Sequence, residues 1–145
     1  MTDFTLIYDK FLSKLTDFSY LNLEQEVLES DLKTRLIIAL SDFTTLDESK
    51  KEYDEYSNCF IEDLNVEEQE ILARLMVVNY LDKFIFSEDL LKSSLNSKDY
   101  KQYSPTNLVK ELRQLKSQFQ SGVYTKMNAY SHSEAIKKAR IKYGK

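Results

Sequence analysis

Hydrophobic side chains recur at steps of three and four residues along much of the chain, the spacing that gathers them on one face of an α-helix. The first such stretch predicts a helix over about 3–16, capped by Thr2 or Asp3. A second predicts a helix over about 23–43, with Asn22 and Gln25 at the spacing of a capping box. The hydrophobic faces consist of Phe4, Ile7, Phe11, Leu12 and Leu15 in the first helix, and Leu28, Leu32, Leu36, Ala39, Leu40 and Phe43 in the second.

The stretch ILARLMVVNYL, residues 71–81, is hydrophobic nearly all the way round a helix. It belongs to a helix predicted over about 66–84, which Asn65 and Glu68 begin with a second capping box. A helix with no wide polar face is buried on most sides, so Leu75 and Val78 are predicted to be in the core.

The remaining segments are more polar. Residues 44–58 predict a surface loop with a short helical turn, and CFIEDL at 59–64 predicts a brief extended stretch. Ser87 is the expected cap of a short fourth helix through about Leu95. Ser104 and Pro105 then predict the start of a long helix over about 105–129, in which Gly122 favours a bend or fraying. Its hydrophobic face consists of Leu108, Leu112, Leu115, Phe119, Val123 and Met127.

Composition supports a helical fold in a single domain. The chain has 145 residues, a length typical of one compact domain, and only two Gly and one Pro, so tight β-hairpin turns have few natural sites. We therefore predict an all-α fold: about five helices in a single small bundle-like domain, with a long C-terminal helix and a basic tail. The expected division is a helical domain at 1–130 and a basic C-terminal arm at 131–145.

Charge is distributed unevenly between these two parts. The arm carries Lys137, Lys138, Arg140, Lys142 and Lys145 against one acidic residue, a net charge of +4. Because the whole chain carries −4, residues 1–130 carry −8. The arm has little apolar surface for packing and is expected to be mobile. Three interpretations remain open: a solvated chain end, a segment that docks on an acidic protein surface, or a contact with phosphates.

Candidate chemistry is sparse, and no enzyme is expected. The sequence contains no GxGxxG, GxxxxGK[ST], GxSxG or HExxH motif. His132, the only histidine, lies among polar residues, and Cys59 has no base or metal partner nearby in sequence. Glu67, Glu68 and Glu70 are expected to complement the helix dipole at the surface. We predict no catalytic residue, no cofactor, no metal site, no secretory leader and no membrane-spanning segment.

Two segments carry a family resemblance. VEEQEILARLMVVNYL at 66–81, followed by LLKSSLNSKDYKQYSPTNLVKELRQL at 90–115, resembles small helical proteins encoded among the head-to-tail connection genes of tailed phages of Gram-positive bacteria. The shared features are an acidic helix start, the LMVV-Y-L centre, a KDY-YS loop and a helix with an L-EL--L rhythm. LESDLKTRLIIALSDF at 28–43 is more faintly similar. The arm at Lys137–Lys145 has no match in this family pattern.

The resemblance implies a virion structural protein, a head–tail connector or adaptor assembled in the host cytoplasm. Such proteins form a ring, usually of twelve copies, between the portal and the stopper or tail-completion protein. DNA would pass through the channel without specific binding, which an acidic body favours. The five basic arm residues would bind an acidic groove of the portal. One flank of helix 66–84 would be covered by the second and fifth helices of its own chain and the other by a neighbouring helix or subunit. A monomer could instead wrap all four of its remaining helices around it.

A second hypothesis places the protein in another class. It would be a small phage-encoded or bacterial regulatory protein that binds a host factor or nucleic acid through the basic C-terminal arm.

Overall fold

The computed structural model describes residues 1–15, 24–94 and 106–143, with the backbone alone for 84, 86–94 and 106–109. Four α-helices lie within these ranges: α1 (Phe4–Ser13), α2 (Gln25–Asp42), α3 (Val66–Ser94) and α5 (Thr106–Lys142). Between α2 and α3 lie the 3₁₀-helix η2 (Glu48–Lys51) and two strands, β2 (Tyr53–Asp54) and β3 (Cys59–Phe60), while β1 (Thr2–Asp3) precedes α1. The predicted helical character and long C-terminal helix are confirmed.

The expectation of a purely α-helical fold is wrong, because the three short strands form an antiparallel sheet in the order β1-β3-β2. Phe60 in the central strand is paired with Thr2 on one side and Tyr53 on the other. Asn58, in the turn before β3, has a φ of 54°, a conformation that asparagine tolerates better than most residues. The predicted extended stretch at 59–64 is confirmed for Cys59 and Phe60, and the predicted helical turn within 44–58 corresponds to η2.

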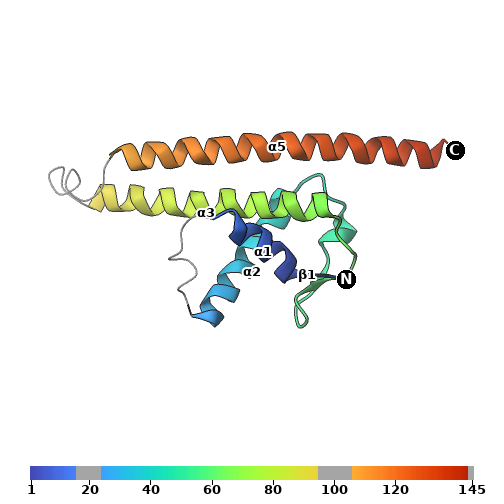
Figure 1. The fold of residues 1–145 in the computed structure, drawn as a ribbon, viewed down its shortest axis with the longest axis horizontal. Helices are drawn as coiled ribbons and strands as arrows, with labels where there is room; N and C mark the ends of the chain where they lie inside the picture. The colour runs from blue at the N-terminus through green and yellow to red at the C-terminus, as the bar shows by residue number, and fades with distance from the viewer. Residues whose placement is uncertain (16–23, 95–105, 144–145) are drawn as a thin grey trace.

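The two longest helices lie side by side and run antiparallel (Figure 1). Lys116 of α5 contacts Asp82 of α3, and Tyr130 of α5 contacts Glu68 near the beginning of α3. The shorter helices α1 and α2 pack against α3 on the side away from α5 (Figure 1). Beyond Tyr130, α5 continues past the beginning of α3, so its C-terminal end projects from the body (Figure 1).

The centre of α3 is buried by helices of its own chain. Leu75 is 3% exposed and Val78 is 7% exposed, which confirms their prediction as core residues. Helices α1, α2 and α5 all contact α3 and bury most of residues 71–81 within the chain.

Two predicted helix ends are confirmed as caps. Asp3 accepts a hydrogen bond from the Thr5 N–H at 2.9 Å, and so caps α1. At the start of α3, Asn65 and Glu68 exchange hydrogen bonds of 2.8 Å between side chain and backbone, which is a capping box. Asn22 and the Ser104–Pro105 pair lie outside the described residues, while α2 begins after Glu24 without a side-chain cap.

Two predicted helix boundaries are wrong. No break occurs at Ser87, because α3 continues from Val66 to Ser94 and absorbs the predicted fourth helix. The last helix does not end near residue 129, since α5 continues through Gly122 and on to Lys142. Residues 131–142 are rich in alanine, lysine and arginine, which favour helix, and each added residue extends an existing helix without a new nucleation step.

Candidate functional site

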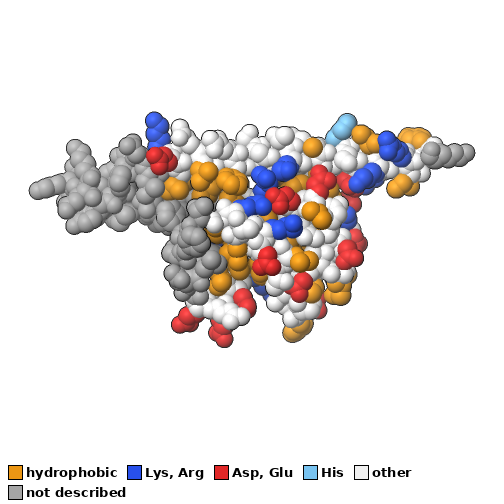
Figure 2. Space-filling model, in the orientation of Figure 1, with side chains coloured by type: hydrophobic (Ala, Val, Ile, Leu, Met, Phe, Trp, Pro, Cys, Tyr) orange, Lys and Arg blue, Asp and Glu red, His pale blue; other side chains and the backbone are white. Residues whose placement is uncertain are grey.

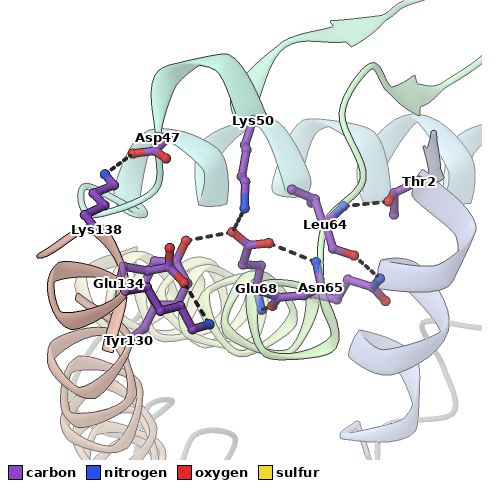
Figure 3. Close-up of polar contacts among 11 residues, drawn as sticks. Thr2, Asp47, Lys50, Leu64, Asn65, Glu68, Tyr130, Glu134 and Lys138 are labelled. Atoms are coloured by element: carbon purple, nitrogen blue, oxygen red, sulfur yellow. Dashed lines mark hydrogen bonds and ion pairs between the residues drawn. The ribbon is translucent and has the colours of Figure 1, made fainter. Parts of the chain in front are cut away.

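A buried carboxylate joins the beginning of α3 to α5. The Glu68 side chain is fully buried, and it lies on the first turn of α3 because it belongs to the capping box. Its Oε1 accepts the Asn65 backbone N–H at 2.8 Å. Its Oε2 accepts the Tyr130 hydroxyl at 2.6 Å and the Lys50 ammonium at 2.8 Å (Figure 3). Three donors from three parts of the chain therefore compensate the loss of water around this charge.

The expectation that Glu68 serves only the helix dipole and the surface is wrong. Sequence reasoning predicted its capping-box partner Asn65 but not Lys50 or Tyr130, which is 62 residues away. One signal was present: Tyr130 follows Val123 and Met127 at helical spacing, so it extends the buried stripe of α5. A tyrosine on such a stripe needs a hydrogen-bond partner in the interior.

The electrostatics of this cluster favour one fixed protonation pattern. Burial, followed by the hydrogen bond to Glu68, raises the pKa of the Tyr130 hydroxyl well above its ordinary value. The hydrogen bond to Glu68 also raises the pKa of Lys50. Tyr130 therefore stays protonated and Lys50 stays charged at neutral pH. The arrangement holds α5 in place against α3 and η2.

The next turns of α5 form two ion pairs, one within the helix and one with the body. Lys137 pairs with Glu134 at 3.4 Å in the same helix, and Lys138 pairs with Asp47 at 3.2 Å (Figure 3). Surface ion pairs of this kind contribute at most about 1 kcal/mol each. Two of the five predicted partner-binding residues are thus occupied within the chain but remain open to solvent.

The projecting end of α5 and the residue after it, together residues 139–143, carry the rest of the predicted site. Arg140 and Lys142 are exposed, and Lys145 lies outside the described residues. Sequence reasoning missed the apolar part of this end: Ile141 is 82% exposed and Tyr143 is 79% exposed. Figure 2 shows hydrophobic and basic side chains together there. Ile141 follows the buried Tyr130 by eleven residues, which is about three helical turns. The two side chains therefore lie on the same face of α5, but Ile141 lies beyond the part of that face that the body covers.

A pocket of about 660 Å³ opens between the C-terminal end of α2, the middle of α3 and α5. Its apolar lining includes Leu75, Val78, Val123 and Met127, and its polar lining includes Asp42 and Asn79. The Nδ2 atom of Asn79 is buried and has no hydrogen-bond partner. The pocket therefore combines an apolar floor with an acidic residue, Asp42, in its lining.

The structure also places the remaining candidate residues, His132 and Cys59. Within the described ranges, no three histidine, cysteine, aspartate or glutamate residues are grouped so that they could hold a metal ion. His132 is exposed, and the half-buried Cys59 donates from Sγ to the Ser57 carbonyl oxygen at 3.4 Å. Among the described helices, none is long and apolar enough to cross a membrane.

Comparisons with protein-family models, with curated proteins and with solved structures gave no match for this chain.

Proposed function

We propose that the protein is a virion structural protein of a tailed phage, a head–tail connector or adaptor. Its subunits would form a ring, of twelve copies as in the family it resembles, between the portal and the stopper or tail-completion protein. The observation that carries the proposal is the projecting end of α5, which is exposed, basic and partly apolar. A helix that extends beyond its own core presents a contact surface that its own subunit does not cover.

The rest of the fold supports a mechanical role. Helices α3 and α5 form a long antiparallel pair, and the buried Glu68 cluster fixes the distal part of α5 relative to the body. The projecting end is therefore held in a defined direction. The features shared with the connector family also have structural roles here, since the acidic start of α3 contains the capping box and its LMVV centre is buried.

The charge distribution fits a channel component. Residues 1–130 carry a net charge of −8, and an acidic channel wall disfavours attachment to DNA phosphates. DNA would thus slide through the ring without specific binding. The basic end of α5 would make an interface with protein instead, where opposite charges fix register and speed association.

Imaging of portal rings from the same phage, with and without the protein, tests this function. A connector is expected to add a ring of density to one face of the portal. A charge-reversed control, Lys110→Glu near the start of α5, should add the same density because Lys110 is far from the projecting end. Portal rings that look the same with and without the protein would refute the connector function.

A second candidate function, a regulatory protein that binds a host factor or nucleic acid, draws on the exposed Arg140 and Lys142. It predicts DNA binding that weakens steeply as salt is raised. The connector proposal predicts no such binding at physiological salt, so a titration with duplex DNA separates the two.

A further inference from the structure

The pocket between α2, α3 and α5 has an uncompensated negative charge at its rim. Asp42 is the last residue of α2, where the helix dipole is negative and a carboxylate is unfavourable. No basic residue occurs in the last turn of α2, and no ion pair compensates the Asp42 carboxylate within the described part of the chain. A cation placed here would interact favourably with both the carboxylate and the helix end.

The interior of the pocket favours an apolar group. Leu75, Val78, Val123 and Met127 supply the apolar wall. A tyrosine side chain suits such a pocket at its mouth, because its ring is apolar and its hydroxyl can stay in contact with water.

The projecting end of α5 carries these same groups. Tyr143 and Ile141 are exposed, and Arg140 and Lys142 lie beside them as cations. The last turn of α5 is basic, whereas the last turn of α2 at the pocket contains an acidic residue and no basic one. The two surfaces are therefore complementary in charge, and both contain apolar side chains.

A chain cannot place its own α5 end in its own pocket. Met127 lines the pocket, and Tyr143, the residue directly after α5, follows it by sixteen residues. At 1.5 Å per residue, the two positions are about 24 Å apart along the helix axis. Since α5 is continuous between them, the occupant must come from another molecule.

We propose that the projecting end of α5 from one copy docks in the pocket of a second copy, an inference that rests on the connector function proposed above. Tyr143 enters the apolar pocket, while Arg140 or Lys142 faces Asp42. The two surfaces are different parts of the chain, so the contact is heterologous and repeats from copy to copy. Such a contact closes into a ring when the rotation between copies allows it, as a connector requires.

Charge reversal on each surface gives a direct test by sedimentation velocity. The Asp42→Lys variant places like charges in the contact on the pocket side, and the Arg140→Glu/Lys142→Glu variant does so on the helix side. Each variant alone should associate at least about tenfold more weakly than the natural protein. A one-to-one mixture of the two variants should assemble again. When the variants alternate, each natural helix end meets a natural pocket and each reversed helix end meets a reversed pocket, so every contact joins opposite charges.

Matched controls reverse charges away from both surfaces. Glu62→Lys, beyond strand β3, and Lys110→Glu, near the opposite end of α5, should leave association unchanged. Variants that associate like the natural protein, or a mixture that stays dissociated, would overturn the pairing. So would a natural protein that remains monomeric both when concentrated and when mixed with portal rings.

A photo-crosslinking amino acid at position 143 identifies the occupant of the pocket. In a mixture of isotopically light and heavy full-length protein, we expect crosslinks from the α5 end of one copy to residues 75–79 or 120–128 of the other. Crosslinks to portal peptides alone would remove this inference and leave the connector function standing. Crosslinks between copies, without added density on portal rings, would support the pairing and remove the connector function.

Discussion

Removal of the Tyr130 hydroxyl isolates the contact through which α5 is fixed to the beginning of α3. In Tyr130→Phe the ring keeps its edge-on packing with Phe43, whose centroid lies 5.4 Å away, so the loss of packing is small. The fully buried Glu68 carboxylate loses one of its donors, while the hydrogen bonds from Asn65 and Lys50 remain. A hydrogen bond to a charged group contributes about 1.5–3 kcal/mol, and we expect a loss of that size.

The assay is urea unfolding followed by far-ultraviolet circular dichroism, with Tyr124→Phe as the matched control. Tyr124 is half exposed and shares a hydrogen bond of 3.1 Å with Gln120 at the surface, so its hydroxyl should contribute less than about 0.5 kcal/mol. If Tyr130→Phe also lowers the free energy of unfolding by less than about 0.5 kcal/mol, burial of the Glu68 carboxylate does not depend on the hydrogen bond from Tyr130. A double-mutant cycle with Lys50→Met should show coupling, since both side chains donate to the same oxygen.

Four further outcomes can be checked on the isolated protein. Leu75→Ala should lower the free energy of unfolding by about 2–5 kcal/mol, and a loss below about 0.5 kcal/mol in denaturant would exclude this residue from the core. Asn65→Ala should cost about 0.5–2 kcal/mol through loss of the cap, and unchanged stability would show that the capping box is dispensable. Because the folded-state pKa values of Lys50 and Tyr130 are raised, the folded protein retains protons that the unfolded chain releases, so stability should fall as pH rises above about 10. A thermal melt across that pH range measures this, and the fall should be smaller in Tyr130→Phe. Deletion of 139–145 should leave the melting temperature nearly unchanged while weakening attachment to portal rings; a truncated protein that unfolds would show that these residues belong to the fold.

Local sequence patterns predicted those helices whose capping and hydrophobic signals lie within a single segment of the chain. The Asn65 and Glu68 capping box needs only a spacing of three residues, and the hydrophobic stretch at 71–81 needs only its own composition to indicate burial. Both were predicted correctly. The faces of α1 and α2 were predicted on the same basis, since Phe4, Ile7, Leu32 and Leu36 are all buried.

Features that depend on distant partners were not predictable in this way. Strand β1 pairs with β3 although Thr2 and Phe60 are far apart in sequence, and strands of two residues are too short to show an alternating pattern. The burial of Glu68 depends on Tyr130 in the same manner. At Ser87, a side chain that favours a helix start also tolerates a helix interior, so the local signal did not distinguish a new helix from a continued one.

The candidate assembly surface was predicted in part. The charge pattern of the sequence drew attention to the basic residues at 137–145. The prediction that the last helix ends before them was wrong, because residues 131–142 belong to α5. The sequence alone does not predict that Ile141 and Tyr143 are exposed, because their exposure depends on where the packed part of the protein ends along α5. The pocket at Asp42 and Asn79 likewise requires the packing of three helices that are separate in sequence.

Cryo-electron microscopy of the neck of the intact virion tests the central claim most directly. The connector account predicts a ring of subunits beneath the portal, each fitted by the antiparallel α3 and α5 pair, with the end of α5 seated in the pocket of the neighbouring copy. A neck fully explained by other chains, in particles from which this protein is absent, would contradict it.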